Sequence, residues 1–326
     1  TKDLPQPLID DYQNRWQAFQ RAAEAAGLPP VTHPAILESS KYVFAFSDFV
    51  ATGCTCDPAV LIDLIDSGDI LQRRQPDDYD HKLKACLANV EDEGSLMRLL
   101  RCCRRRELVR IAWRDLAGWA DLAETMADLS DFADACLHHT LEILHQWQCD
   151  KSGLPTAEDG SEQHLVILGL GKLGARELNF SSDVDLIFAY PRGGETTGAQ
   201  HSSGNEDFFS RLCRRLIKVI GQPTADGFVF RVDARLRPFG ESGPLTMDFD
   251  TMEQYYQQQG REWERYALIK ARAVAGAIEA GSHLLERLHP FIYRRYLDYS
   301  AFESLREMKQ MIARDVKRKG MDNNIK

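Results

Sequence analysis

The chain has 326 residues, of which 44% are hydrophobic and 27% are charged, and these proportions are ordinary for a globular protein. This length is enough for two or three domains, each with a core of its own. The formal net charge is −9, which argues against general nucleic-acid binding because that function favours a basic surface. Any recognition of phosphate must therefore be local.

Membrane insertion and disulfide bonding are also disfavoured by the sequence. No apolar run approaches the roughly 20 residues of a membrane span. The N-terminus is polar and mixed in charge, unlike a signal peptide. The eight cysteines include no Cys-x-x-Cys pair, so we expect free buried thiols in a reducing compartment, not disulfides or zinc ligands. These features together predict a cytoplasmic protein.

The first part of the chain has the pattern of an all-helical domain. Residues 8–27 form an amphipathic helical pattern that ends in glycine and proline. Residues 42–71 predict two or more short helices, with Gly53 as one of the breaks between them. Residues 79–150 carry apolar side chains at helical spacing and predict long helices. We therefore expect an N-terminal helical domain over residues 1–155.

A basic run lies inside this domain, and its six arginines are Arg98, Arg101, Arg104, Arg105, Arg106 and Arg110. On a helix they spread around more than one face. One interpretation is that they are solvated and pair with the acidic residues of EDEG just upstream. The other is that they form a contact surface for an acidic partner or for the nucleotide-binding part of the chain. The sequence leaves the role of this run open.

The middle of the chain alternates between strand and helix patterns. Residues 151–163 are rich in turn formers and predict a linker. The expected elements that follow are a strand at 164–170, a short helix near 174–179, a strand at 184–190, a polar glycine-bearing loop, a helix at 206–220 and a strand at 227–233. This alternation predicts a sheet with helices packed on it, in a domain over residues 156–249.

Within this domain, residues 165–190 place a glycine turn between two apolar runs. The glycines of GLGKLG let backbone N–H groups come close to a phosphate. Asp183 and Asp185 then project from the same face of a strand, since the side-chain period of a strand is two. Two carboxylates on one face repel each other unless a cation lies between them. Oxygen ligands of this kind suit Mg²⁺, which is completed by waters and substrate phosphates.

A third carboxylate comes from the next predicted strand, which ends at Asp233 and is followed by Arg235 and Arg237. An Asp-x-Asp pair alone is a weak signal, because surface strands often carry two acids. Together with Gly171 and the later aspartate it forms a polymerase-β-like nucleotidyltransferase pattern, with three aspartates that hold two metal ions. The predicted fold is a multidomain α and α+β protein, in which a polymerase-β-like nucleotidyltransferase domain with a mixed sheet is flanked by helical segments.

Three long motifs give the chain a specific resemblance: GKLGARELNFSSDVDLIF, RVDARLRPFGESGPL and QGREWERYALIKAR. They resemble the bacterial glutamine synthetase adenylyltransferase/adenylyl-removing enzymes, which carry two nucleotidyltransferase modules in one long chain. The likeness covers nearly the whole sequence. This sequence reads ELNFSSDVDL at the place where the adding module of the family has a Gly-Tyr-Gly-Ser-Asp type of signature. In this respect it resembles the N-terminal, adenylyl-removing module. The family continues beyond this point, so we expect the sequence to be a truncated fragment.

The resemblance implies removal of AMP from a tyrosine of glutamine synthetase by metal-dependent phosphorolysis, which gives ADP. Two Mg²⁺ ions, or Mn²⁺ in their place, are expected at the three aspartates: Asp183 and Asp185 bridge both ions, and Asp233 holds the one nearer the nucleophile. The residues expected to bind nucleotide or phosphate are Gly171, Lys172, Ser182, Arg235 and Arg237. Simpler alternatives are that Lys172 extends into solvent and that Arg237 pairs with a nearby acid.

The last part of the sequence, residues 250–326, is expected to be a C-terminal helical segment, and an incomplete one. Helices are predicted at 249–259, 261–277, 283–297 and 301–319. In the second of these, Arg261, Arg265 and Lys270 are candidates for contacts with the substrate. The alternative is a charged helix that packs its aromatic stripe on the sheet.

Two other functions remain open. The first is the same chemistry run forwards, which is ATP-dependent adenylylation of glutamine synthetase. The second is a regulatory module that binds nucleotide, or the nitrogen-signalling PII protein, without turnover. The expected partners are glutamine synthetase, PII, ATP or ADP, and phosphate, with no nucleic acid and no membrane.

Overall fold

The computed structural model describes residues 4–75, 77–198 and 202–293, together with residues 306, 309–311, 313 and 314. The chain divides into two compact units. The first, here called the helical unit, comprises Thr1–Leu144, Arg176–Asp183 and Arg215–Val232. The second, the sheet unit, comprises His145–Ala175, Val184–Arg214 and Asp233–Lys326.

The helical unit confirms the helices predicted for the first part of the chain. They are α1 (Gln6–Ala25), α2 (Pro34–Phe46), α3 (Asp48–Cys56), α4 (Pro58–Asp66), α5 (Asp78–Leu87), α6 (Glu93–Leu116) and α7 (Leu122–Ser152), the last of which belongs to this unit as far as Leu144. Side-chain caps begin α3 and α6: the Ser47 hydroxyl accepts from the Val50 N–H, and the Asp92 carboxylate accepts from the Ser95 N–H. Gly53, predicted as a break, instead lies inside α3.

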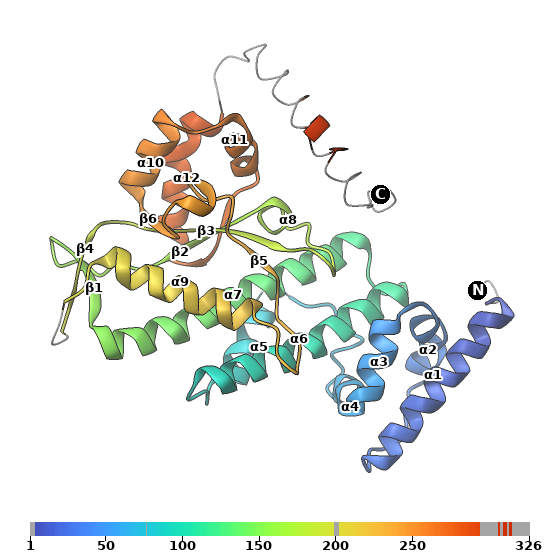
Figure 1. Cartoon of the computed structure of the whole chain (residues 1–326). Coiled ribbons are helices and arrows are strands. Elements are labelled where there is room, and N and C mark those ends of the chain that lie inside the picture. Colours follow the sequence, from blue (N-terminus) through green and yellow to red (C-terminus); the bar gives the residue numbers. More distant parts are fainter. Residues whose placement is uncertain are drawn as a thin grey trace. The chain divides into compact units, whose positions relative to one another are not determined.

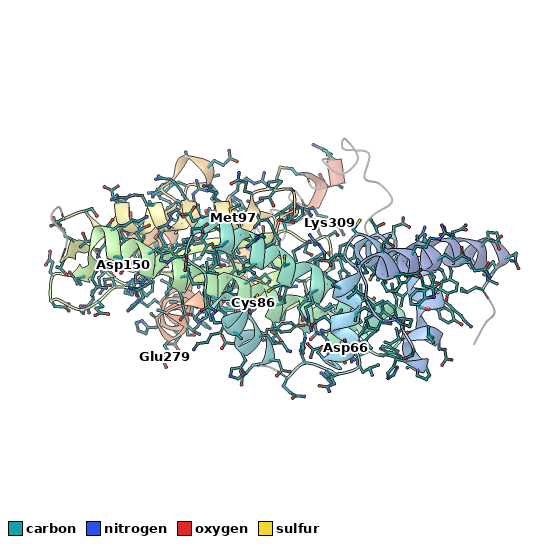
Figure 2. All side chains as sticks on the ribbon, turned by 90° about the horizontal axis from the view of Figure 1, so that it is seen from below. Asp66, Cys86, Met97, Asp150, Glu279 and Lys309 are labelled. Atoms are coloured by element: carbon teal, nitrogen blue, oxygen red, sulfur yellow. The ribbon has the colours of Figure 1, made fainter. Side chains whose placement is uncertain are left out.

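Aromatic side chains form the core of the N-terminal helices. Trp16 lies 5.0 Å from Phe19 and 5.0 Å from Phe44 between ring centroids, and Phe44 in turn contacts Trp113 of α6. The Trp113 indole N–H donates to the Ser39 hydroxyl at 2.9 Å, which satisfies its polar edge inside the core. Figure 2 shows the side chains on these elements, with Cys86 on α5 and Met97 on α6.

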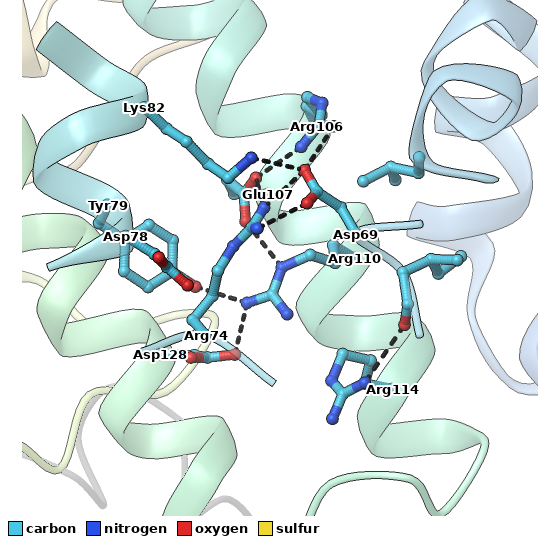
Figure 3. Close-up of polar contacts among 12 residues, drawn as sticks. Asp69, Arg74, Asp78, Tyr79, Lys82, Arg106, Glu107, Arg110, Arg114 and Asp128 are labelled. Carbon is cyan, nitrogen blue, oxygen red and sulfur yellow. Dashed lines mark hydrogen bonds and ion pairs between the residues drawn. The ribbon is translucent and has the colours of Figure 1, made fainter. Parts of the chain in front are cut away.

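Arg101 and Arg110 of the basic run on α6 are buried, and Arg105, Arg106 and Arg110 pair with carboxylates outside EDEG, so the interpretation as solvated arginines facing EDEG is wrong. Arg110 is fully buried, and it contacts Glu107 at 2.8 Å and Asp128 at 2.5 Å (Figure 3). Arg106 contacts Glu107 and Asp69, each at 2.8 Å. These pairs share partners with Arg74, which contacts both Asp69 and Glu107. A buried charge is tolerated only when it is paired, and this network pairs each one.

Arg101 has a different structural role. Its side chain is 1% exposed and donates to the carbonyl oxygens of Gly227, Val219 and Gln222, at 2.7, 3.1 and 2.5 Å. The guanidinium therefore holds the end of a helix and the turn after it against α6. This contact lies within the helical unit.

The sheet unit contains a mixed sheet, as predicted, and it has five strands. Its strands are β2 (Val166–Leu170), β3 (Val184–Tyr190), β5 (Val232–Asp233), β6 (Thr246–Asp248) and β7 (Arg272–Gly276). The order is β5-β3-β2-β7, with β6 paired in parallel to β3. The pairs β2–β3 and β2–β7 are antiparallel. A separate two-stranded ribbon joins β1 (Leu154–Ala157) and β4 (Gly194–Thr197).

Helices cover the sheet. The helices of this part are α8 (Gly171–Gly174), α9 (Asn205–Gly221), α10 (Phe249–Gln258), α11 (Glu262–Ile269) and α12 (Ile278–Ile292), with a short 3₁₀ turn, η1 (Gly240–Ser242). Of these, α9 belongs to the sheet unit as far as Arg214. Apolar residues of β2 and β3 share a buried cluster with α10, α11 and α12, which lie together in Figure 1. All five residues of β2 are buried, as expected for a strand covered on both faces.

Four local predictions differ from the structure. The expected linker, residues 151–163, contains β1, and the short helix lies at 171–174 and not near 174–179. Only the last two residues of the expected strand 227–233 pair in the sheet, because the backbone N–H groups at 229 and 230 donate to the carbonyl at the end of α9. The expected helix 261–277 is α11 followed by β7, so residues 250–326 also contribute a strand to the sheet.

The predicted helix at 283–297 corresponds to α12, and most of the one at 301–319 lies outside the described residues. In the part of the chain that the structure describes, no helix has both the length and the apolar character needed to cross a membrane. The eight cysteines are free thiols, of which Cys54, Cys136 and Cys213 are buried.

Candidate active site

The predicted glycine turn lies directly beside one of the predicted aspartates. β2 ends at Leu170, which pairs with Asp185 on β3, and Gly171 then begins α8 with φ +55°. A Cβ atom added at Gly171 would lie 2.7 Å from Oδ2 of Asp185. Glycine is required here twice: for its left-handed backbone and for the close approach of the carboxylate. The half-buried Asp185 therefore faces the start of the turn.

The other end of the turn is held by β7, a contribution that the sequence analysis missed. A Cβ atom at Gly174 would lie 2.0 Å from the carbonyl oxygen of Lys270, so only glycine lets the two backbones pass. The Arg272 guanidinium donates to the Leu173 carbonyl at 3.1 Å. The alternation of small and apolar residues in RAVAG was the available signal for this strand, but it directly follows the pattern of α11.

Asp183 precedes β3 and lies in an exposed loop organised by Asn179. The Asn179 amide oxygen accepts from the Ser181 N–H at 3.1 Å and from the Ser182 hydroxyl at 2.8 Å, and the Asn179 N–H donates to Ser182 Oγ at 3.2 Å. Arg231 donates to the Asp183 carboxylate and to the Ser181 carbonyl. The Ser182 hydroxyl, predicted to bind phosphate, thus serves the loop in this structure.

Asp233 ends β5, the neighbour of β3 in the sheet, and it also holds an arginine. The Arg235 side chain contacts the carboxylate through Nε at 2.9 Å and Nη2 at 2.5 Å, and the Arg235 N–H donates to it at 2.8 Å. These hydrogen bonds lower the pKa of Asp233. They also raise the pKa of Arg235, to which the negative charge of Asp185 contributes. The Arg235 guanidinium therefore pairs with Asp233, and the charge of Asp185, on the adjacent strand, adds a smaller attraction.

The three predicted metal ligands are carboxylates, the kind of side chain that suits a divalent cation. Within the described ranges, no group of three or more His, Cys, Asp or Glu side chains is arranged to hold a metal ion. Two of the three predicted ligands instead contact a guanidinium, as the Asp183–Arg231 and Asp233–Arg235 pairs show. Carboxylate oxygens are the ligands that Mg²⁺ prefers, and ionised carboxylates near one another need positive charge. The donor set therefore fits a divalent cation.

The other predicted site residues take different positions. Lys172 is exposed on α8, which is compatible with either of its interpretations. Arg237 organises its own loop: it donates to the carbonyl oxygens of Ala234 at 2.7 Å, Pro244 at 3.1 Å and Glu241 at 3.2 Å. It pairs with carbonyl groups and not with an acidic side chain.

The three candidate substrate-binding residues on the predicted helix 261–277 also differ from one another in exposure and in their contacts. Arg261 is exposed, and its backbone N–H donates to Glu264 at 2.7 Å, which caps α11. Arg265 is 7% exposed, donates to the Phe291 carbonyl at 2.7 Å and contacts Glu262 at 2.5 Å. Lys270 is exposed at the end of α11. Of the three, Arg265 has the environment of a residue that packs α11 onto α12.

Comparisons with known proteins agree with this reading of the fold. Residues 37–287 match the family described as glutamate-ammonia ligase adenylyltransferase. A bifunctional glutamine synthetase adenylyltransferase/adenylyl-removing enzyme of Nitrosococcus oceani is 52% identical over 324 residues, which are 99% of this chain and 33% of the relative. Proteins with the same name from Pseudomonas aeruginosa and Pseudomonas putida are 54% and 51% identical, over 89% and 99% of this chain and 30% and 34% of theirs.

The names of these relatives describe nucleotidyltransferases that act on glutamine synthetase. The chain spans about a third of the length of the curated relatives that it matches. The family match covers most of the chain, and sequence identity above 50% is higher than a shared fold alone would give. The chain therefore belongs to the glutamate-ammonia ligase adenylyltransferase family.

Proposed function

We propose that this chain removes AMP from a modified tyrosine of glutamine synthetase by metal-dependent phosphorolysis. The observation that carries the proposal is the position of Asp185 and Asp233 on adjacent strands, with the Gly171 turn so close that a Cβ atom added there would lie 2.7 Å from Oδ2 of Asp185. A carboxylate pair beside a glycine turn suits a site where a cation and a phosphate meet. The relatives that match this chain are named for both addition and removal of the adenylyl group.

In the proposed reaction, an oxygen of inorganic phosphate attacks the phosphorus of the AMP group. The bond between that phosphorus and the tyrosine oxygen breaks, and ADP and the tyrosine phenolate leave. The pKa of a phenol is about 10, so the phenolate is a tolerable leaving group and needs no strong general acid. Magnesium, held by Asp183, Asp185 and Asp233, would supply the positive charge that stabilises the attacking and leaving oxygens.

The residues around the acids have supporting roles in this proposal. The backbone of the Gly171 turn contacts phosphate oxygens, and the Ser182 hydroxyl does so when it leaves Asn179. Arg235 would offset phosphate charge next to Asp233, and exposed Lys172 would do the same from α8. Arg237 has an indirect role in this proposal, because its hydrogen bonds to backbone carbonyl groups fix the loop that follows Asp233. The proposal carries with it a cytoplasmic location and a response to PII, as the resemblance implies.

The direction of the reaction is tested with two labels. Adenylylated glutamine synthetase, Mg²⁺ and labelled phosphate should give labelled ADP, and the Asp185→Asn variant should give none while keeping its thermal unfolding temperature. Unmodified glutamine synthetase with ATP labelled in its α-phosphate should not gain label. Incorporation of label in the second assay, without ADP in the first, would favour adenylylation, the other activity in the relatives' names. Undiminished turnover by Asp185→Asn would show that the assignment of the site is wrong.

A further inference from the structure

A groove with aromatic walls lies in the helical unit, apart from the residues assigned above. Its volume is about 370 Å³, within the range of binding sites for small groups. α6 forms one side through Arg104, Leu108 and Asp115. The side chains of Phe46 and Phe49 line it from α2 and α3. Phe180, from the loop that leads to β3, completes the aromatic lining.

The three phenylalanines are unusually open to solvent. Phe46, Phe49 and Phe180 are 56%, 44% and 41% exposed, although burial of each ring would be favourable. Arg104 and Asp115, eleven residues apart on α6, place the groove along about 16 Å of helix at 1.5 Å per residue. A contiguous group of exposed aromatic side chains with a charged group at each end is typical of an interaction site and not of a bare protein surface.

Among the described residues Arg104 has no acidic partner, in contrast to Arg105, Arg106 and Arg110 on the same helix. Arg105, Arg106 and Arg110 each form ion pairs with carboxylates. Among the described residues, no ion pair to Arg104 is present, and its buried Nε has no hydrogen-bond partner. Its guanidinium stacks 5.0 Å from the ring centroid of Phe228, and burial lowers its pKa. A partly buried cation of this kind is best satisfied by an incoming anion.

The chain itself links the groove to the candidate active site. Phe180 belongs to the segment Arg176–Asp183, so it precedes Asp183 by three residues. That segment is fixed to α7: the Leu178 N–H donates to the Ser130 hydroxyl at 3.3 Å, and Arg176 forms an ion pair with Asp131. Phe180 is thus presented by an anchored loop. An occupant of the groove would lie next to the loop that carries a proposed metal ligand.

We propose that this groove binds a polypeptide segment of the protein substrate beside the modified residue, with an apolar side chain among the three phenylalanines and a carboxylate at Arg104. This inference rests on the proposed function for the identity of the substrate. The aromatic walls supply affinity through burial, and the single unpaired cation specifies an acidic residue. In this proposal the groove distinguishes a protein substrate from a small adenylylated compound, because only a protein has a polypeptide segment that extends from the modified residue into the groove.

The test compares two substrates in two groove variants, Phe49→Ala and Arg104→Gln. The substrates are adenylylated glutamine synthetase and the small compound O-adenylyl-tyrosine amide. Loss of a groove contact should raise KM for the protein on the order of tenfold at nearly unchanged kcat, and should leave kinetics with the small compound unchanged. The matched controls are Leu122→Ala, which removes a side chain that is 69% exposed elsewhere, and Arg98→Gln, which removes an exposed arginine of the same helix.

An unchanged KM for the protein in both groove variants would overturn the inference. An equal loss with both substrates would also overturn it, since the groove would then act on the catalytic residues. If the wild-type chain turns over neither substrate, the proposed function fails, and the groove is tested by binding alone. Biolayer interferometry with immobilised glutamine synthetase should then show weaker binding by both groove variants than by both controls. Equal binding would refute the groove as the docking site.

Discussion

Replacement of Gly171 by alanine separates the role of the glycine turn in the site from its role in the fold. The backbone at Gly171 has φ +55°, a conformation that costs an alanine about 1–2 kcal/mol. The new Cβ atom would also lie 2.7 Å from Oδ2 of Asp185, so the carboxylate must move by about 0.7 Å to reach ordinary contact at 3.4 Å. A displacement of that size at a reacting centre reduces the rate on the order of 100-fold.

Gly160→Ala is the matched control, because Gly160 has φ +81° and no heavy atom within 4 Å of the added Cβ. Urea denaturation should show that both variants lose about 1–2 kcal/mol of unfolding free energy. Release of ADP from adenylylated glutamine synthetase should fall in Gly171→Ala alone. Equal activity in the two variants would refute the inference that the turn sets the position of Asp185.

Three further predictions concern stability. Gly174→Ala should lose more unfolding free energy than Gly160→Ala, about 2–4 kcal/mol, because its Cβ would lie 2.0 Å from the Lys270 carbonyl oxygen; a loss equal to that of Gly160→Ala in urea denaturation would contradict the close crossing. Arg110→Met should cost about 3–5 kcal/mol by the same measurement, since it removes the arginine that pairs with buried Asp128 and one of the three arginines that pair with Glu107, and a neutral result would show that the network is dispensable. Burial alone would raise the pKa of Glu107. The positive charges of Arg110 and the neighbouring arginines outweigh burial, and they hold this pKa below its ordinary value of 4.5. Glu107 therefore stabilises the fold above that pH, and its contribution is lost as the pH falls further. Burial raises the pKa of Asp128, so the ionised form of this group lowers the stability of the fold and its protonation on acidification restores it. Between pH 6 and pH 3, the unfolding free energy of Arg110→Met should fall less on acidification than that of the wild-type chain. An identical pH dependence in the two proteins would show that the ion pair between Arg110 and Glu107 is not the source of the acid sensitivity.

Local patterns in the sequence were enough to predict the elements that carry the acids. The strand at residues 184–190 was predicted with its observed bounds, because Asp185 is followed by an uninterrupted apolar run. The glycine turn was also predictable, since three glycines in six residues between apolar runs leave few other structures. The family resemblance rested on these same motifs, and the family match confirmed it.

Contacts between distant parts of the chain were beyond local patterns. β7 directly follows α11 with no glycine or proline between them, so residues 261–277 had the pattern of one helix, and the support of the turn by Arg272 was missed. The burial of Arg101 and Arg110 depends on carbonyl groups and carboxylates that lie between 3 and 126 residues away. An arginine in a helix pattern is indistinguishable from a solvated one until those partners are placed.

The central claim is that Asp183, Asp185 and Asp233 hold divalent cations, which replace the arginine contacts of Asp183 and Asp233. Titration of the chain with Mn²⁺ in the presence of ADP, followed by electron paramagnetic resonance of the free ion, measures this directly. Two bound ions in the wild-type chain, and loss of both in Asp185→Asn with the fold intact by circular dichroism, are the predicted result. Equal Mn²⁺ binding by the wild-type chain and by a variant with all three aspartates changed to asparagine would contradict the claim.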